Sequence, residues 1–105
     1  MIEADWKVFR AIIPALRERY LRKRRESLLA LLSAPGKTET ERFWAAEERV
    51  SHEAQILREC FDDLRRSRLF ERLLSMRSHG MLADEDLGQF SEELQAKLRE
   101  YDREG

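Results

Sequence analysis

The sequence predicts an all-α fold, an up-and-down antiparallel bundle of about four helices that begins with a long N-terminal helical hairpin. Its 105 residues are 39% charged but include only four Gly and two Pro, a composition typical of long solvated helices. Apolar residues recur at three- and four-residue spacing, and no strand-length window alternates apolar with polar residues. The hydrophobic content of 42% suits one core, so we expect a single helical domain over residues 1–105.

The first helix is predicted over residues 5–32 by apolar side chains along one stripe. That stripe contains Trp6, Phe9, Ile13, Leu16, Tyr20, Leu28 and Leu31. Pro14 falls inside the helix, where proline removes a backbone hydrogen bond. Two arrangements are open. We favour one helix kinked at Pro14; the other is a short helix ending near Ile12, followed by a second that begins with Pro14 in its first turn.

The second helix is predicted to begin at a capping box, Thr38-x-x-Glu41, in which each side chain satisfies a free backbone amide. Pro and Gly within residues 33–37 end the helix before it. We expect the second helix to end around residues 62–64. Its predicted apolar face consists of Phe43, Ala46, Val50, Ala54, Leu57, Phe61 and Leu64.

Three shorter helical segments are predicted in the last third of the chain. The first covers residues 67–79, and Gly80 is placed as its left-handed C-cap. A helical turn follows over residues 84–89. The last helix covers residues 91–103, with Ser91 as its N-cap and acidic residues in its first turn, where the helix dipole favours them.

Charges alternate in sign along the chain, although the formal net charge is only −1. Residues 1–37 contain nine basic and four acidic residues, and residues 38–64 contain three and eight. Residues 65–80 contain five and one, and residues 81–105 contain three and eight. Neighbouring helices of opposite charge favour an antiparallel arrangement with short connections.

The register of the hairpin is predicted from an arginine on the apolar stripe of the first helix. Arg24 lies between the directions of Leu21 and Leu28, where an unpaired guanidinium is unfavourable. A hairpin centred near residue 35.5 aligns residues whose numbers sum to about 71, since both helices rise equally per residue. We therefore expect a partly buried ion pair between Arg24 and Glu47 that sets the register more than it adds stability.

The residues do not predict an enzyme, a cofactor or a metal site. Gly36-Lys37-Thr38 resembles the end of a phosphate-binding loop, but Leu31 stands where that motif needs another Gly, and no strand precedes it. His52 and His79 are the only histidines, and His79 is expected near a helix C-terminus, where an imidazolium is favoured. Cys60 has helix neighbours that are apolar, so we interpret it as a buried hydrophobe rather than a nucleophile.

Residues 73–87 read Leu-Leu-Ser-Met-Arg-Ser-His-Gly-Met-Leu-Ala-Asp-Glu-Asp-Leu, a leucine-bearing helix followed by Gly, two apolar residues and an acidic helix. This segment, extended to about residues 69–98, resembles the SHOCT motif, a short helical hairpin. The resemblance implies self-association or docking on a partner. The chain departs from the pattern at Ala83, where a hydroxyl cap is usual, and at Ser91, which restarts the helix.

The densest basic run of the chain is residues 17–25, with six positive residues in nine. Clustered Lys and Arg can neutralise phosphates and release counterions, so a nucleic-acid-associated regulator is the alternative function. The basic residues point around the helix rather than along one face, and acidic segments compensate them elsewhere. Under this alternative the contacts are Arg17, Arg19, Arg22, Lys23, Arg25, Arg65, Arg66 and Arg68.

The function that we predict is a non-enzymatic helical interaction or assembly module, either a homo-oligomer or a protein that docks on another. Trp44 and Ile56 lie off the apolar face of the second helix, so they meet either another helix of the chain or a partner. No 18-residue apolar stretch predicts a membrane span, and an acidic start argues against a signal peptide. With a single cysteine we expect a cytoplasmic protein, and we infer no small-molecule ligand.

Overall fold

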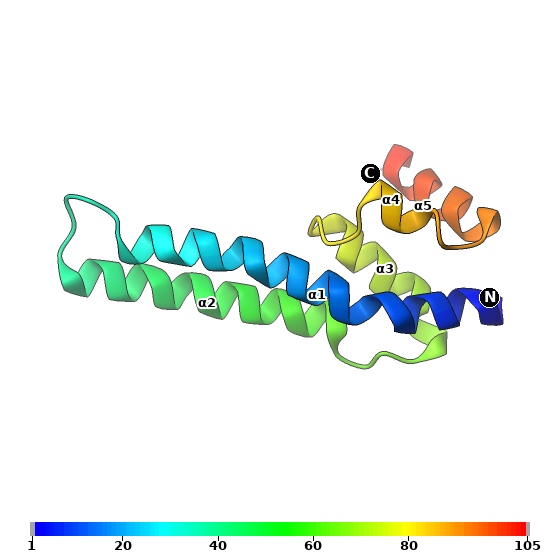
Figure 1. Ribbon diagram of the computed structural model, residues 1–105, viewed down its shortest axis with the longest axis horizontal. Coiled ribbons are helices and arrows are strands. Elements are labelled where there is room, and N and C mark those ends of the chain that lie inside the picture. Colours follow the sequence, from blue (N-terminus) through cyan, green and yellow to red (C-terminus); the bar gives the residue numbers. More distant parts are fainter. Residues whose placement is uncertain (1, 105) are drawn as a thin grey trace.

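The computed structural model describes residues 2–104 and contains helices without strands over that range, so the predicted all-α class is confirmed. The elements are α1 (Glu3–Leu32), α2 (Glu39–Phe61), a 3₁₀ turn η1 (Arg66–Arg68), α3 (Leu69–Ser78), α4 (Asp84–Leu87) and α5 (Glu92–Glu104). Figure 1 shows α1 and α2 side by side as a long antiparallel hairpin. The three later helices gather beside the N-terminal half of α1.

α1 continues through Pro14 without a break. The alternative of two helices divided there is therefore wrong. Pro14 lies on the exposed side of the helix, where its ring does not disturb the buried stripe. Trp6, Phe9 and Leu16 on that stripe are buried, as predicted.

A tight loop reverses the chain between α1 and α2. Gly36 has a φ of +73°, a conformation that favours glycine. The capping box has the predicted partners: Thr38 Oγ1 accepts from the Glu41 amide at 3.0 Å, and the Glu41 carboxylate accepts from the Thr38 amide at 2.8 Å. These bonds lower the pKa of Glu41, most through the Thr38 backbone amide.

The side of α2 that contacts α1 differs from the predicted apolar face. Glu53, Ile56 and Cys60 are buried together with Ala46, which belongs to the predicted face. Of the other members of that face, Leu57, Phe61 and Leu64 pack against the core, whereas Phe43 and Val50 are exposed. The apolar pattern misplaced the face because a charged residue, Glu53, occupies its centre. A buried carboxylate is tolerated there because it has hydrogen-bonding partners.

A Schellman turn ends α3 and sends the chain toward α4. Gly80 has a φ of +73°, its amide bonds to the Arg77 carbonyl at 3.1 Å, and the Met81 amide bonds to the Met76 carbonyl at 2.8 Å. Gly80 therefore occupies the left-handed position predicted for it. Ser91 likewise caps α5, because its hydroxyl accepts from the Leu94 amide at 3.2 Å.

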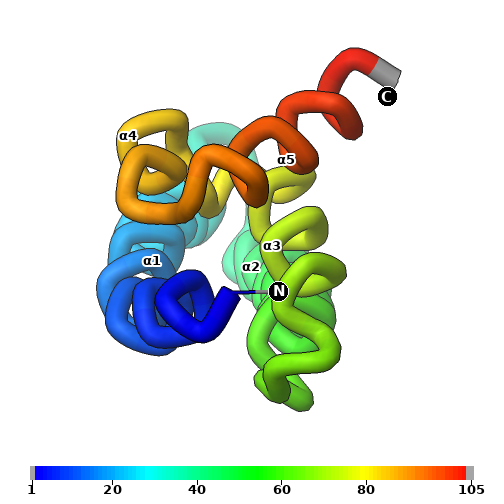
Figure 2. The backbone as a smooth tube through the Cα atoms, turned by 90° about the vertical axis from the view of Figure 1, so that its right-hand side faces the viewer, coloured from blue at the N-terminus to red at the C-terminus, as the bar shows by residue number. Residues whose placement is uncertain are grey.

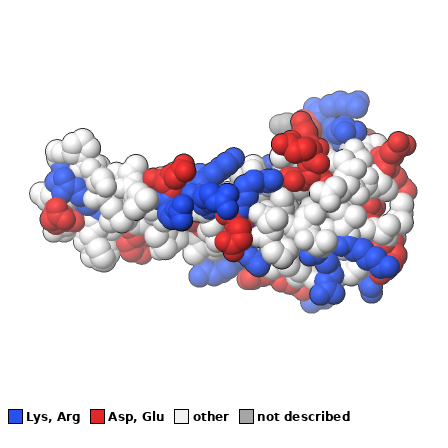
Figure 3. Space-filling view, viewed as in Figure 1, with Lys and Arg blue, Asp and Glu red and all other residues white. Residues whose placement is uncertain are grey.

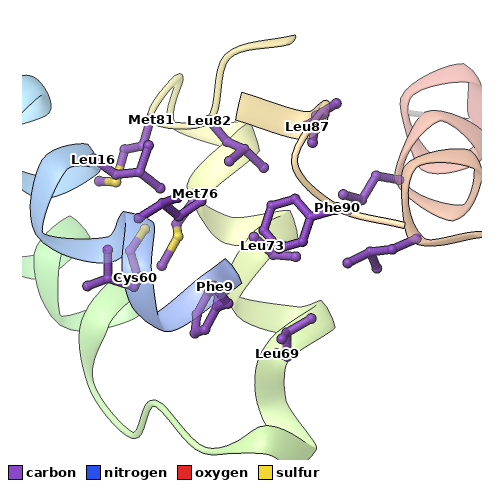
Figure 4. Close-up of a cluster of buried hydrophobic side chains, with 14 of the residues drawn as sticks. Phe9, Leu16, Cys60, Leu69, Leu73, Met76, Met81, Leu82, Leu87 and Phe90 are labelled. Atoms are coloured by element: carbon purple, nitrogen blue, oxygen red, sulfur yellow. The ribbon is translucent and has the colours of Figure 1, made fainter. Parts of the chain in front are cut away.

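The core lies where the N-terminal half of α1 meets the end of α2 and the three later helices. Figure 4 shows Leu16, Cys60, Met76 and Leu87, which come from four helices, within one cluster. Figure 2 shows those helices grouped around one another in a view along the hairpin. We call the half of the hairpin that ends in the α1–α2 loop the far half, and the other the near half. The far half has no third helix beside it (Figure 1). This half gives the molecule its long dimension of 53 Å.

Candidate protein-binding surface

Apolar side chains from both helices line one side of the far half of the hairpin. Each residue of an α-helix is rotated by 100° from the one before it, so Phe43, Val50 and Ala54 share one side of α2, and Leu28 and Leu32 share one side of α1. Viewed along its own chain direction, each set is turned in the same sense away from the side of its helix that contacts the other helix. Because the two helices are right-handed and run antiparallel, this turn brings both sets to the same side of the hairpin. We call these five residues the hairpin face.

The hairpin face is exposed. Leu32, Phe43 and Val50 are 50%, 58% and 50% exposed, and Leu28 and Ala54 are partly exposed. Glu59 lies nine positions after Val50 and therefore points to the opposite side of α2. Its carboxylate contacts the imidazole of His79, which follows α3, at 3.2 Å. α3 therefore meets α2 from the opposite side, and within residues 2–104 Leu32, Phe43 and Val50 of the hairpin face stay exposed.

Charges border the hairpin face at both ends. Figure 3 shows an uncharged stretch of the hairpin between a group of basic side chains midway along it and a few charges near its tip. Residues 17–26 contain six basic and two acidic residues, and residues 36–48 contain two basic and four acidic residues. Because Tyr20 lies opposite Glu53, Glu47 and Glu48 lie level with residues 25 and 26 of the basic run. The tip, residues 27–46, has two basic and two acidic residues and no net charge.

A buried hydrogen bond joins the two helices on their contact side. The Tyr20 hydroxyl donates to the Glu53 carboxylate, and Arg49 approaches the other carboxylate oxygen at 3.3 Å. Burial and the bond to Glu53 raise the pKa of Tyr20 to about 12. The residue numbers of Tyr20 and Glu53 sum to 73, whereas the predicted register aligned residues whose numbers sum to about 71. The two helices are therefore shifted along each other from the predicted alignment.

The predicted ion pair between Arg24 and Glu47 is wrong. Glu47 is exposed and accepts instead from the Ser51 hydroxyl at 2.8 Å. The Arg24 guanidinium lies 4.7 Å from the centre of the Tyr20 ring, a distance typical of a cation–π contact. The observed register aligns Arg24 with Arg49 rather than with an acid, so the guanidinium has an aromatic ring beside it, and its buried Nε has no hydrogen-bond partner among the described residues.

The two residues predicted to contact a partner have different surroundings. Ile56 is 7% exposed and belongs to the core, so the interpretation as contact within the chain holds for it. Trp44 is 59% exposed. Its ring meets the Phe43 ring edge-on, with 5.0 Å between centroids, so Trp44 borders the hairpin face.

Most of the arginines of the alternative nucleic-acid surface have acidic or aromatic partners in the chain. Arg65 and Arg68 pair with Asp63, and Arg66 pairs with Glu3. Arg17 stacks over the Phe61 ring. Arg22, Lys23 and Arg25 are exposed, and no ion pair involves them within the described residues.

Two polar contacts that the sequence did not predict hold the later helices against α1. The Arg19 guanidinium donates to Asp86 at 2.6 Å and to the Met81 carbonyl at 2.8 Å. Asp5 is 3% exposed and accepts from both the amide and the hydroxyl of Ser91 at 2.7 Å. Each pair is more than 60 residues apart in sequence, so local spacing carries no signal of it.

The candidate nucleophile and metal ligands do not assemble into a site. Cys60 is fully buried, and burial raises the pKa of its thiol to about 11. His52 is exposed. Over residues 2–104, no three His, Cys, Asp or Glu side chains are grouped to hold a metal ion, and none of the helices described is long and apolar enough to cross a membrane.

Comparison with known proteins finds no matching family model, no matching curated protein and no matching solved structure. The segment that resembles the SHOCT motif forms α3, the Schellman turn, α4 and part of α5. At Ala83 only one half of a capping box forms: the Asp86 carboxylate accepts from the Ala83 amide at 2.8 Å, and Ala83 has no hydroxyl to accept in return. The implied docking role of this segment stays a prediction.

Proposed function

We propose that this chain is a non-enzymatic helical interaction module that binds protein through the hairpin face. The observation that carries the proposal is the exposure of Leu32, Phe43 and Val50 on the half of the hairpin that α3–α5 leave uncovered. Binding of a partner to an apolar patch formed by two helices is favourable, because it removes the apolar surface from water. The exposed ring of Trp44 beside it adds a residue type enriched at binding hot spots.

The packed base of the molecule supports this role. The core and the two polar contacts of α1 anchor the near half of the hairpin, so the far half projects from a folded base. A surface presented on ordered helices loses little conformational entropy on binding. We retain the cytoplasmic location as a prediction.

Site-specific photo-crosslinking in cells that express the chain tests the proposal. A photoreactive residue at position 50 should form adducts with protein, and Phe43→Glu should abolish them. The same residue at position 55, exposed on α2 away from the hairpin face, is the matched control. Equal crosslinking from both positions, or none from position 50, would contradict the proposal.

The alternative is binding of nucleic acid by Arg22, Lys23 and Arg25, favoured by their exposure without ion pairs in the described chain. Three phosphate contacts would give a slope of log affinity against log salt near −3 for duplex DNA. Titration of labelled DNA and RNA from low to physiological salt measures it. The triple replacement by Gln should abolish such binding while leaving crosslinking from position 50 unchanged.

A further inference from the structure

We propose that a cavity in the packed base of the molecule binds a free apolar amino acid. This inference goes beyond the proposed function, because the cavity lies at the end of the molecule opposite the α1–α2 loop. The helices α1, α3 and α5 all begin at that end (Figure 1). Residues at the start of α1, in η1 and α3, and at the start of α5 line a cavity of about 250 Å³. No sequence pattern indicated such a ligand, because the three segments lie far apart along the chain.

The floor of the cavity is apolar. Leu69 and Leu94 are buried core residues that line it, together with Phe70 and Ile2. Its volume is below the roughly 300–1,000 Å³ typical of sites for drug-sized ligands. The cavity therefore suits a small ligand with one apolar group, rather than a nucleotide or a peptide.

A buried carboxylate also lines the cavity. Asp5 is 3% exposed and accepts two hydrogen bonds from Ser91, but it forms no ion pair within residues 2–104. Buried charges are normally paired with an opposite charge, and each oxygen of a carboxylate can accept more than one hydrogen bond. Asp5 can therefore accept a hydrogen bond from an ammonium group bound in the cavity.

A cation lines the same cavity. The Lys97 ammonium forms no ion pair among the described residues and lies 4.4 Å from the centre of the Phe70 ring. Arg66 also lines the cavity, but its guanidinium binds the Glu3 carboxylate at 2.7 Å. Lys97 can therefore bind a carboxylate of the ligand. The Ser67 hydroxyl, which forms no hydrogen bond within the described chain, can donate to the same group.

These groups together favour an α-amino acid over a simple amine or a simple acid. The ammonium and carboxylate groups of a zwitterion are attracted by Asp5 and Lys97 respectively. A simple amine would leave Lys97 unpaired, and a simple acid would leave Asp5 unpaired. Glu93, exposed at the rim of the cavity, provides a second carboxylate for the ammonium group. The apolar floor then receives a large apolar side chain, such as that of leucine or phenylalanine.

Titration of the full chain with free phenylalanine, followed by nuclear magnetic resonance, tests the site. We expect saturable shifts of the backbone amides in residues 66–70 and 91–97, and none at the tip of the hairpin. Phenethylamine lacks the carboxylate and phenylpropionate lacks the ammonium group. Each should bind at least about tenfold more weakly than phenylalanine, because it loses a charge-assisted hydrogen bond. An absence of shifts with phenylalanine would overturn the inference, and so would analogues that bind as tightly.

Substitutions test the contact with the ligand carboxylate. Lys97→Gln should weaken the binding of phenylalanine at least about tenfold and should not weaken the binding of phenethylamine. Ser67→Phe, at an exposed position of η1, should abolish binding of both because the new ring fills the cavity. Wild-type affinity for phenylalanine in either variant would contradict the assigned cavity.

A second substitution tests the contact with the ammonium group. Asp5 also anchors α5, so Glu93→Gln is the appropriate variant. It should weaken the binding of phenylalanine about two- to fivefold, as expected for an exposed ion pair. Glu92→Gln is the matched control, since Glu92 is exposed in the same turn of α5 and does not line the cavity. Equal affinities for these two variants would count against the role of Glu93.

Discussion

Tyr20 of α1 and Glu53 of α2 meet across the hairpin, and the phenol donates its hydrogen bond to a carboxylate that is only 6% exposed. This contact, rather than an arginine–glutamate ion pair, aligns the two long helices. Glu53 has one further partner, Arg49 on its own helix. The stability and the register of the hairpin should both respond when the contact is removed.

Tyr20→Phe should lower the free energy of unfolding by about 1–3 kcal/mol, because it leaves a buried carboxylate oxygen without its donor. Glu47→Ala should cost no more than about 0.5 kcal/mol, since that side chain is exposed. Urea unfolding measures both. If Glu47→Ala costs as much as Tyr20→Phe, the register of the hairpin is not the one described here.

Thr38→Ala should destabilise the protein by about 1 kcal/mol, because it removes the hydroxyl that accepts from the Glu41 amide. Thr40→Ala is the matched control, since Thr40 is exposed within α2. Thermal unfolding followed by circular dichroism compares them. Equal melting temperatures for the two variants would count against the cap.

Asp5→Ala should destabilise the protein by about 2–3 kcal/mol, because the amide and hydroxyl of Ser91 both lose a charged acceptor in a buried site. Hydrogen exchange should accelerate at the first amides of α5 more than in α2, as the contact anchors the start of α5. Glu3→Ala, on the exposed side of the same turn, should change stability by less than about 0.5 kcal/mol. Uniform acceleration in all helices would argue against a local anchor.

Acid should weaken the attachment of α4 to α1. Burial tends to raise the pKa of Asp86, but hydrogen bonds from Arg19 and from the Ala83 amide outweigh it, so the net pKa lies below the usual value. A carboxylate with a lowered folded-state pKa stabilises the protein above its unfolded pKa of about 4, and this contribution is lost as the pH falls through the folded pKa.

Unfolding free energies measured between pH 6 and pH 2 should therefore fall less steeply for Asp86→Asn than for the wild type. Asp62→Asn, at an exposed carboxylate after α2, should keep the wild-type slope. An unchanged slope in Asp86→Asn would show that the Arg19 contact does not form in solution.

The Cys60 thiol should react with alkylating reagents only when the protein opens. Burial raises its pKa to about 11, so the reactive thiolate is scarce at neutral pH, and the fully buried sulfur is out of reach. Labelling in native buffer should be at least about a hundredfold slower than in denaturant. Because the pKa of the Cys60 thiol is higher in the folded than in the unfolded protein, the protonated thiol contributes fully to stability below about pH 8.5. This contribution is lost as the pH rises toward 11. Rapid native labelling at pH 7 would contradict the burial of Cys60.

Local features of the fold follow from the sequence because they depend on neighbours along the chain. The capping box at Thr38, the left-handed Gly80 and the cap at Ser91 each involve residues within a few positions of one another. Helical class follows from periodicity in the same way. These features could be predicted because a hydrogen bond between near neighbours is set by residue type and backbone geometry alone.

The side on which α2 meets α1, the register of the hairpin and the contacts of Arg19 and Asp5 were decided only by the tertiary structure. A charged residue such as Glu53 does not by itself indicate a buried position. Glu53 can be buried because the hydroxyl of Tyr20, on the other helix, donates a hydrogen bond to its carboxylate. The hairpin face follows from the same choice. Once Glu53 and Ile56 turn toward the core, the rotation of 100° per residue turns Phe43 and Val50 toward solvent, and no pattern in one helix alone shows which side its neighbour will cover.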